Sequence, residues 1–308
     1  MESSRISIVI PVYNSEKTIR PLVDKLIRIL SQPLEIVLVN DGSRDASSEV
    51  CRTAQTDYPD MVRYVELSRN YGEHCAVMAG LNQSTGDYVV IMDDDFQNPP
   101  EEVLKLVAEA KRNGHDVVYS CYKEKKHSYF RNLGSRFNNS VATVLLKKPK
   151  DLYLSSFKCI NRFVVDEIVK YDGPYPYIDG LIFRITDRYG VVQVQHDARL
   201  DGESGYTLAK LIRLWMNMFV NFSLLPLRVT TLLGCLMSLF ALLYMIWVMI
   251  CNFIEPDLPA GWPTTVVLIT LFSGAQLVMI GLLGEYVGRI FLSQNKTPQY
   301  CIRKVYKQ

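Results

Sequence analysis

Three consecutive carboxylates, Asp93, Asp94 and Asp95, are the residues of this chain whose type and spacing most clearly suggest chemistry. Adjacent like charges repel one another, so the arrangement needs a compensating cation. A hard divalent ion takes oxygen ligands of this kind and often holds a substrate phosphate as well. Because alternate residues of an extended chain share a face, we expect Asp93 and Asp95 to be the working pair, with Gln97 adding a neutral oxygen. From the triplet alone, a solvated acidic turn is an equally good interpretation.

The elements around the triplet suggest how it is positioned. An apolar run, residues 88–92, directly precedes it, and a second run, residues 35–39, stops at Asn40-Asp41. Strand-like runs alternate with helical patterns over about the first 120 residues, which predicts an α/β fold with a doubly wound, mostly parallel sheet. Ligands bind such sheets beyond the carboxyl ends of the strands. We therefore expect Asp41 and the triplet to face the same crevice.

Periodicity and turn residues give the expected elements in more detail. Asn98 could cap a helix that has two prolines in its first turn and Gly114 beyond its end. The expected elements are strand 6–12, helix 19–30, strand 35–39, helix 47–56, strand 62–67, a helical stretch ending at 81, strand 88–92, the helix after Asn98, and strand 117–121.

Composition excludes some classes of function. The 34 basic and 32 acidic residues give a net charge of +2, which is too near neutral to indicate nucleic-acid binding. The seven cysteines are odd in number and form no CxxC pair, so free thiols in a reducing compartment are favoured over a disulfide or zinc framework. The first residues lead into a strand rather than a secretory signal, so we expect the catalytic part to stay in the cytoplasm.

The last third of the chain has a different character. Residues 229–254 and 264–284 contain no charged side chain, and each run could span a hydrocarbon core of ~30 Å. Lys and Arg flank the outer ends of the pair but are missing from residues 252–263 between them. The positive-inside rule then places the connection outside and both ends in the cytoplasm. Residues 208–222 have an amphipathic pattern, which predicts a helix lying in the headgroup layer. Buried helices of a soluble core, and a core-facing amphipathic helix, are the alternatives.

Several motifs occur together in a fixed order along the chain. They are Pro11-Val12-Tyr13-Asn14, Val39-Asn40-Asp41-Gly42-Ser43, Arg69-Asn70-Tyr71-Gly72, Ala79-Gly80-Leu81, Gly86-Asp87 and the segment 92–101 that contains the triplet. In this order the sequence resembles the family 2 inverting glycosyltransferases, and more narrowly the polyprenyl-phosphate glycosyltransferases. The likeness continues through residues 199–206, both apolar runs and residues 281–290, so it covers nearly the whole chain.

The resemblance implies an overall organisation. Residues 1–205 would form a cytoplasmic catalytic domain of the GT-A type, and residues 206–224 a juxtamembrane amphipathic helix. Residues 225–292 would form two transmembrane helices joined by a short external loop, and residues 293–308 a cytoplasmic tail. The protein would then be a multi-pass protein of the cytoplasmic (inner) membrane, and a homo-oligomer packed through its spans.

The resemblance also implies substrates and residue roles. The donor would be a UDP-, GDP- or dTDP-linked sugar, and the acceptor a polyprenyl phosphate such as undecaprenyl phosphate. Mg²⁺ or Mn²⁺ would be held on the donor diphosphate by Asp93 and Asp95, assisted by Gln97. The nucleotide would be bound by Pro11, Tyr13, Asn14, Asp41, Arg69, Asn70 and Asp94. The acceptor phosphate would lie near Arg131 and Arg136, and the loop closing over the site would contribute Arg199 and Ser204. For the two arginines near the acceptor, a solvated helix face is the alternative.

Two departures from the family pattern concern the substrates. Gly205 stands in the closing loop where relatives commonly carry Lys, and Ser156 stands where many carry Asp. A rival interpretation is transfer to a hydroxyl of a lipid-linked glycan, which would need a general base such as Asp179, Asp201 or Glu203. A catalytically silent membrane scaffold is a further alternative, against which the intact carboxylate set argues.

Overall fold

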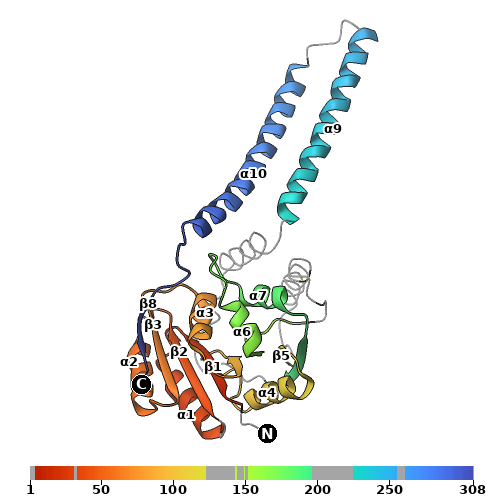
Figure 1. Cartoon of the computed structure of the whole chain (residues 1–308). Coiled ribbons are helices and arrows are strands. Elements are labelled where there is room, and N and C mark those ends of the chain that lie inside the picture. The colour runs from red at the N-terminus through yellow and green to blue at the C-terminus, as the bar shows by residue number, and fades with distance from the viewer. Residues whose placement is uncertain are drawn as a thin grey trace. The chain divides into compact units, whose positions relative to one another are not determined.

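The structure is a computed structural model that describes residues 4–30, 33–122, 152–195, 225–254 and 261–307, together with residues 143 and 149. The described chain divides into two compact units. The first contains the residues up to 195 and returns with residues 296–307, and the second contains two long helices (Figure 1). The chain therefore leaves the first unit once and comes back to it.

The first unit is an α/β structure built on one eight-stranded sheet. Its strands are β1 (Ile6–Val12), β2 (Leu34–Asn40), β3 (Val62–Leu67), β4 (Tyr88–Ile91), β5 (Val117–Tyr122), β6 (Lys158–Asn161), β7 (Tyr189–Val194) and β8 (Ile302–Tyr306). Its helices are α1 (Ile19–Ile29), α2 (Ser47–Asp57), α3 (Glu73–Gln83), α4 (Glu102–Asn113), α6 (Arg162–Ile168) and α7 (Ile178–Ile185).

The strands lie in the order β7-β5-β6-β4-β1-β2-β3-β8. The four strands β4, β1, β2 and β3 are parallel, as expected, and β5 runs parallel to β7. Strand β6 is antiparallel to both of its neighbours, and β8 is antiparallel to β3. The sheet is thus mixed at its two outer parts and parallel at its centre, where the carboxyl ends of four strands meet at one edge.

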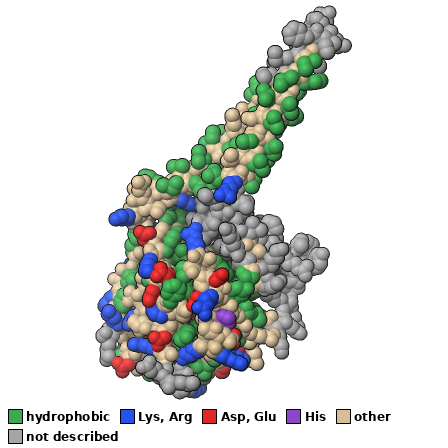
Figure 2. Space-filling model, turned by 45° about the vertical axis from the view of Figure 1, so that its right-hand side comes forward, with side chains coloured by type: hydrophobic (Ala, Val, Ile, Leu, Met, Phe, Trp, Pro, Cys, Tyr) green, Lys and Arg blue, Asp and Glu red, His purple; other side chains and the backbone are tan. Residues whose placement is uncertain are grey.

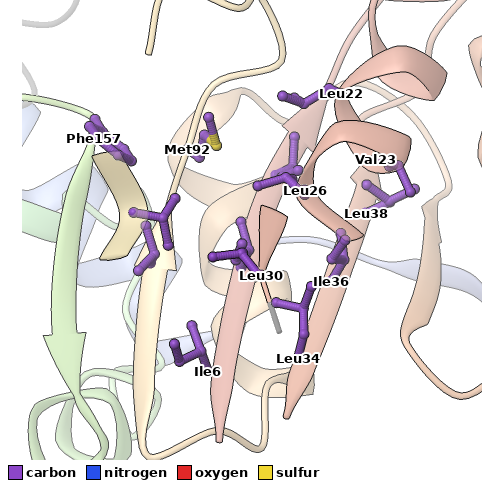
Figure 3. Close-up of a cluster of buried hydrophobic side chains, with 14 of the residues drawn as sticks. Ile6, Leu22, Val23, Leu26, Leu30, Leu34, Ile36, Leu38, Met92 and Phe157 are labelled. Atoms are coloured by element: carbon purple, nitrogen blue, oxygen red, sulfur yellow. The ribbon is translucent and has the colours of Figure 1, made fainter. Parts of the chain in front are cut away.

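Helices on both faces bury the central strands, which explains their nearly continuous apolar sequences. On one face, Leu22 and Leu26 of α1 pack with Ile36 and Leu38 of β2 in the main core cluster (Figure 3). On the other face, Gly80 lets α3 lie directly on the sheet, because a Cβ there would be 2.3 Å from Cγ1 of Val9. This packing fixes the strand ends that carry the candidate site.

The helix after β4 begins later than expected. It starts at Glu102, and its first bonds are 3₁₀-like, from Glu102 N to the oxygen of Pro99 (3.0 Å) and from Val103 N to Pro100 (3.2 Å). Asn98 does not cap it, because its side-chain oxygen accepts a bond from the Tyr122 hydroxyl (3.0 Å). The expected end is confirmed, since Gly114 has φ +62° there.

Three strands were not expected from the sequence, namely β6, β7 and β8. The β6 strand has only four residues and begins with a buried lysine, so it shows no apolar run. Residues 293–308 were expected to be a tail, whereas Ile302–Tyr306 pairs with β3 and forms one edge of the sheet. Its exposed Arg303 and Lys304 suit an edge, where charged side chains discourage further strand pairing.

The second unit consists of α9 (Leu225–Ile254) and α10 (Trp262–Gln294). Both are long and apolar enough to cross a membrane, with windows at Leu227–Tyr244 (mean hydropathy 1.7) and Leu271–Gln294 (1.4) in which no part is buried. Hydrophobic side chains cover these helices in Figure 2, and Leu277 is 71% exposed. Helices of a soluble core would be buried, so exposure favours the membrane interpretation. The expected amphipathic helix, residues 206–224, lies outside the described residues.

Candidate active site

The acidic triplet follows β4, and its side chains reach three different neighbours. Oδ2 of Asp93 accepts a hydrogen bond from the Ser156 hydroxyl, with an Oγ–Oδ2 distance of 2.5 Å. Asp94 accepts one from the hydroxyl of Ser15, in the loop after β1. Oδ1 of Asp95 accepts from the backbone N–H of Gln97 (3.1 Å). Asp93 and Asp94 are thus bound by different parts of the fold, while the pairing of Asp93 with Asp95 stays a prediction.

The electrostatics of the triplet are those of crowded carboxylates. Burial, together with the nearby Glu73 carboxylate, raises the pKa of Asp93 to about 7, although the bond from Ser156 opposes the rise. Burial also raises the pKa of Asp94 to about 6, opposed by the bond from Ser15. Each ionised carboxylate is thus held in a place where the protein does not fully compensate its charge. A cation would supply that compensation.

The residue Asp41 joins the loops that follow β2 and β3. Its two oxygens accept the backbone N–H groups of Tyr71 (2.7 Å) and Gly72 (2.8 Å), and the residue is only 3% exposed. Burial raises the pKa of Asp41, while these two bonds lower it. Gly42 lies so close to the second loop that a Cβ would be 2.6 Å from the carbonyl carbon of Arg69 and from the nitrogen of Asn70. The two loops are therefore interlocked at the carboxyl edge of the sheet.

The loop after β1 completes this edge. Asn14 has φ +55°, and its backbone N–H donates to the hydroxyl of Ser43 (3.1 Å). Its side-chain oxygen accepts the backbone N–H of Arg44 (2.8 Å). Tyr13 next to it is 45% exposed, and Pro11 lies within β1. The residues predicted to bind a nucleotide thus come from adjoining loops, as their positions after successive strands suggested.

The two exposed residues of the loop after β3 have different surroundings. The guanidinium of Arg69 lies over the ring of Tyr71, 4.9 Å from its centroid. Asn70 contributes its backbone to the packing against Gly42. Their predicted nucleotide contacts stay predictions. Four other predicted residues, Arg131, Arg136, Arg199 and Ser204, lie outside the described residues, as do Asp201 and Glu203.

A buried ion pair that the sequence did not reveal lies near the triplet, because Lys158 pairs with Ile91 of β4. Nζ of Lys158, at the start of β6, contacts Oδ1 of Asp179 on α7, and the hydroxyl of Tyr119 donates to the same oxygen (3.1 Å). Their side chains are 4% and 10% exposed. Asp179 was a candidate base for a hydroxyl acceptor, and the structure shows that Lys158 and Tyr119 both bind one of its carboxylate oxygens.

Two further residues near the site were also missed. Glu73 is the first residue of α3 and is exposed. The protein around its carboxylate nevertheless desolvates that group, which raises the pKa of Glu73. His74 packs edge-on against Tyr177 (centroids 5.0 Å apart), and burial lowers its pKa to about 4, so it is neutral at pH 7. Only their place directly after the Arg69–Gly72 motif could have signalled them. In the described ranges, no group of three or more His, Cys, Asp and Glu side chains forms a complete metal site.

Comparison with known proteins places these features in a family. Residues 7–169 match the model of glycosyl transferase family 2. The chain is 34% identical over 307 residues to the undecaprenyl-phosphate 4-deoxy-4-formamido-L-arabinose transferase of Proteus mirabilis strain HI4320, covering 98% of this chain and 94% of that protein. The protein of the same name from Yersinia enterocolitica serotype O:8 is 35% identical over 306 residues, covering 98% and 93%.

The fold has relatives among solved structures. The glucosyl-3-phosphoglycerate synthase of Mycobacterium tuberculosis, in complex with Mn²⁺, UDP-glucose and phosphoglyceric acid, aligns with a TM-score of 0.54 at 18% identity, covering 70% of this chain and 78% of that one. This likeness confirms the expected GT-A-type fold. With the family model matching more than half of the chain and the relatives matching nearly all of it, this chain belongs to glycosyl transferase family 2, in its polyprenyl-phosphate glycosyltransferase group, and is a glycosyltransferase.

Proposed function

We propose that this enzyme transfers a single sugar from a nucleotide-sugar to the phosphate of undecaprenyl phosphate, with inversion at the anomeric carbon, for cell-surface glycan synthesis or modification. The observation that carries the proposal is similarity over 98% of the chain, both apolar helices included, to two proteins named as undecaprenyl-phosphate transferases. The sugar and nucleotide of this chain are left open, because donor preference depends on side chains spread over several loops.

The carboxylates after β4 fit Mg²⁺ or Mn²⁺. Asp93 and Asp95 offer hard oxygens, Gln97 could add a neutral one, and Lys158 close by is already paired with Asp179. Such an ion takes its remaining ligands from water and substrate phosphates, so two protein carboxylates suffice. When bound, it would neutralise charge on the departing nucleoside diphosphate. The fold relative noted above was solved with Mn²⁺ and UDP-glucose together, a divalent metal and a nucleotide-sugar, which are the two classes of ligand proposed for this site.

The protein's own residues prepare the donor site before any ligand arrives. Ser156 orients Asp93 from the side of β6, and Ser15 holds Asp94 away from that partner. Asp41 fixes the loop of Tyr71 and Gly72 through its two oxygens. The nucleotide would lie over these loops, where Tyr13 presents an exposed ring. A preorganised site of this kind avoids an ordering cost at the moment of binding.

The acceptor chemistry needs little from the enzyme. The oxygen of a phosphate monoester is already ionised at neutral pH, so it can attack without a strong general base. The involvement of Asp179 with Lys158 is consistent with this requirement. Arg131 and Arg136 would hold the acceptor phosphate, since a guanidinium binds phosphate oxygens in pairs. Arg199 and Ser204 would close over the bound substrates.

The path of the chain supports a specific membrane topology. It leaves the first unit before α9 and returns to it at β8 after α10. An even number of crossings is therefore required between these points, which agrees with two spans and an external connection near residues 255–260. With Lys and Arg at the outer flanks, the catalytic unit and both termini would lie on the cytoplasmic side of the inner membrane. Association of copies through the spans is part of the same proposal.

The experiment that tests this function uses membranes containing the full-length protein. They are incubated with undecaprenyl phosphate, Mn²⁺ and a panel of labelled UDP-, GDP- and dTDP-sugars. We expect label from one donor to enter an organic-soluble lipid that mild acid cleaves. Label that appears only in longer glycans would instead support a hydroxyl acceptor, and no transfer from any donor would support a catalytically silent protein.

A further inference from the structure

The strand β8 belongs to the catalytic unit although it follows the second candidate span. Only residues 295–301 separate it from the end of α10 at Gln294. Tyr306 pairs with Tyr64, Val305 with Val65 and Lys304 with Glu66, so that β8 lies along β3 at the edge of the sheet (Figure 1). The pairing shifts by one residue between Glu66 and Leu67. That irregularity lies next to the loop that carries the Arg69–Gly72 motif.

The residue before β8 holds this loop directly. The carbonyl oxygen of Cys301 accepts the backbone N–H of Ser68 (2.9 Å), and Nη2 of Arg303 reaches the oxygen of Ser68 (3.4 Å). Ser68 opens the segment Ser68–Gly72, whose backbone N–H groups at Tyr71 and Gly72 bind the carboxylate of Asp41. The loop Ser68–Gly72, which binds the Asp41 carboxylate, is therefore held in place by residues from the far end of the chain.

The last residue of β8, Tyr306, contacts the residues that hold the loop after β2. The ring of Tyr306 stacks on that of Tyr64, with centroids 5.1 Å apart and planes at 20°. The hydroxyl of the buried Tyr64 accepts a bond from Nδ2 of Asn40 (3.2 Å) and lies 2.9 Å from Oγ of Ser48. Asn40 directly precedes Asp41 and bonds the N–H of Ser43 through its Oδ1 (3.0 Å). Tyr306 thus packs on Tyr64, which in turn hydrogen-bonds Asn40 at the start of the loop after β2.

The segment leading into β8 is also anchored. The Tyr300 hydroxyl accepts a bond from Nδ2 of Asn82 on α3 (3.1 Å), and Nε2 of Gln299 donates to the oxygen of Tyr171 after α6 (2.7 Å). A loose tail would not make such contacts. The stretch from Gln299 to Tyr306 is therefore tied to α3, to the segment after α6 and to β3.

We propose that this stretch, residues 299–306, is a positioning element of the donor site, which sets the conformation of the two loops around Asp41 and so determines nucleotide affinity. The inference rests on the proposed function, because it takes the nucleotide to bind at these loops. None of residues 299–306 needs to touch the donor; they act through Ser68 and Tyr64. Because the stretch continues from α10, its non-covalent contacts with Ser68 and Tyr64 also connect the donor loops to a candidate span.

A purely structural role would be to close the sheet edge, and it predicts a different result. Edge closure alone would change the fraction of folded enzyme, and so the apparent kcat, while leaving the affinity of the folded molecules for nucleotide unchanged. A positioning role raises the Kd for nucleotide and the donor KM, and leaves the KM for undecaprenyl phosphate as it was. The Kd for nucleotide therefore distinguishes a positioning role from simple closure of the sheet edge.

The test compares full-length protein with four variants in detergent. Tyr306→Ala removes the stacked ring and Tyr306→Phe keeps it; a deletion of residues 299–308 removes the whole stretch, and a deletion of residues 307–308 leaves it intact as a matched control. UDP, GDP and dTDP are titrated with Mn²⁺ by calorimetry, and the nucleotide that the unaltered protein binds most tightly serves as the probe. Thermal unfolding checks that each variant is folded.

We expect Tyr306→Ala to weaken nucleotide binding by about fivefold, the effect of losing one aromatic pair. Tyr306→Phe and the two-residue deletion should bind as the unaltered protein does, and the ten-residue deletion should bind more weakly than Tyr306→Ala. Equal nucleotide affinity in folded Tyr306→Ala and Tyr306→Phe would overturn the positioning role while leaving the proposed function intact. If the unaltered protein binds none of the three nucleotides, the proposed function itself fails.

Discussion

At the scale of single residues, the hydroxyl of Ser156 decides how Asp93 is presented. It occupies Oδ2 of the carboxylate, which leaves Oδ1 as the oxygen expected to bind a cation. An Asp at position 156 would add a further carboxylate to the repulsion around the triplet. A serine there orients the same group without adding charge. Partners of this kind fix the orientation of a metal ligand and tune its basicity.

Replacing Ser156 by Ala should weaken Mn²⁺ binding near neutral pH. The hydrogen bond favours the ionised form of Asp93, so its loss raises a pKa that already stands at about 7, and protons compete better with the metal. Mn²⁺ binding, followed by electron paramagnetic resonance across a pH series, should therefore develop at higher pH in the variant. Thr53→Ala, at an exposed hydroxyl on α2, serves as the control. An unchanged pH profile would refute this role for Ser156.

The charge of Asp93 should cost stability in the absence of metal. Its pKa is about 7 in the folded protein and ~3.9 in an unfolded chain, so the folded state binds the proton more tightly. The stability that this provides is complete below about pH 4 and is lost as the pH rises through about 7. Asp93→Asn should therefore raise the melting temperature of metal-free protein by ~2–4 °C at pH 8 and change it little at pH 4. Differential scanning calorimetry at both pH values checks this, and a lower melting temperature at pH 8 would contradict it.

Some of these residues could be read from the sequence and others could not. Asp41 and the triplet follow apolar strands, so parallel pairing alone predicts that they share an edge. The partners Ser15 and Ser156 have no such signal, because a hydroxyl in a loop reveals nothing about which carboxylate lies opposite. The ion pair of Lys158 with Asp179 was hidden for a similar reason: both residues appear as ordinary charges until β6 and α7 are packed together.

At the scale of elements, the site depends on how closely the loops after β2 and β3 approach. Gly42 and Gly114 both have positive φ, +65° and +62°, but only Gly42 lies against another backbone. A Cβ at Gly114 would meet only the flexible end of Arg188, at 3.6 Å. The two glycines therefore separate the effect of backbone conformation from the effect of loop packing.

Gly42→Ala should damage nucleotide binding far more than Gly114→Ala. Both substitutions carry the strain of a left-handed residue, about 1 kcal/mol, which lowers stability to a similar degree. Only the change at Gly42 also pushes the Arg69–Asn70 backbone away by a clash at 2.6 Å and disturbs the bonds to Asp41. Unfolding free energies and nucleotide affinities of both variants test this. Equal affinities would show that the loops need not interlock.

The elements themselves were predictable where they bury an unbroken apolar face. Strands β1 and β3 match their expected bounds, because most of their residues are apolar and buried. Strand β8 could not be found in this way. It is a short edge strand with two adjacent charged residues, Arg303 and Lys304, and its pairing with β3 joins residues more than 230 positions apart. Such pairing is a property of the assembled sheet and not of the local sequence.

At the scale of the whole molecule, the catalytic unit is interrupted by the pair of apolar helices. The chain that begins the sheet at β1 also completes it at β8, after both candidate spans. If both helices span a membrane, the two ends of the helix pair lie on the same side of it, because both join the catalytic unit. The Lys and Arg residues at the outer ends of the two apolar runs predict the same arrangement. The path of the chain supports it independently.

Cysteine labelling in intact cells tests this topology. With native Cys235 and Cys301 replaced by Ser, a cysteine at Asp257 between the spans should react with a membrane-impermeant maleimide added from outside. A cysteine at Lys307 should react only after the membrane is permeabilised. Labelling of both positions from outside, or of Lys307 alone, would be incompatible with an external connection and a cytoplasmic catalytic unit.

The most direct measurement of the central claim is sugar transfer to undecaprenyl phosphate by unaltered enzyme and by Asp95→Asn, each with and without added Mn²⁺ after chelation. The amide keeps the shape of the side chain and removes the charge that a divalent ion requires. We expect the unaltered enzyme to form labelled lipid only when metal is restored, and Asp95→Asn to lose at least about 100-fold in rate, on the scale seen when a key electrostatic group is removed. Full transfer by Asp95→Asn, or undiminished transfer by the chelated enzyme, would contradict a metal-dependent transferase centred on this triplet.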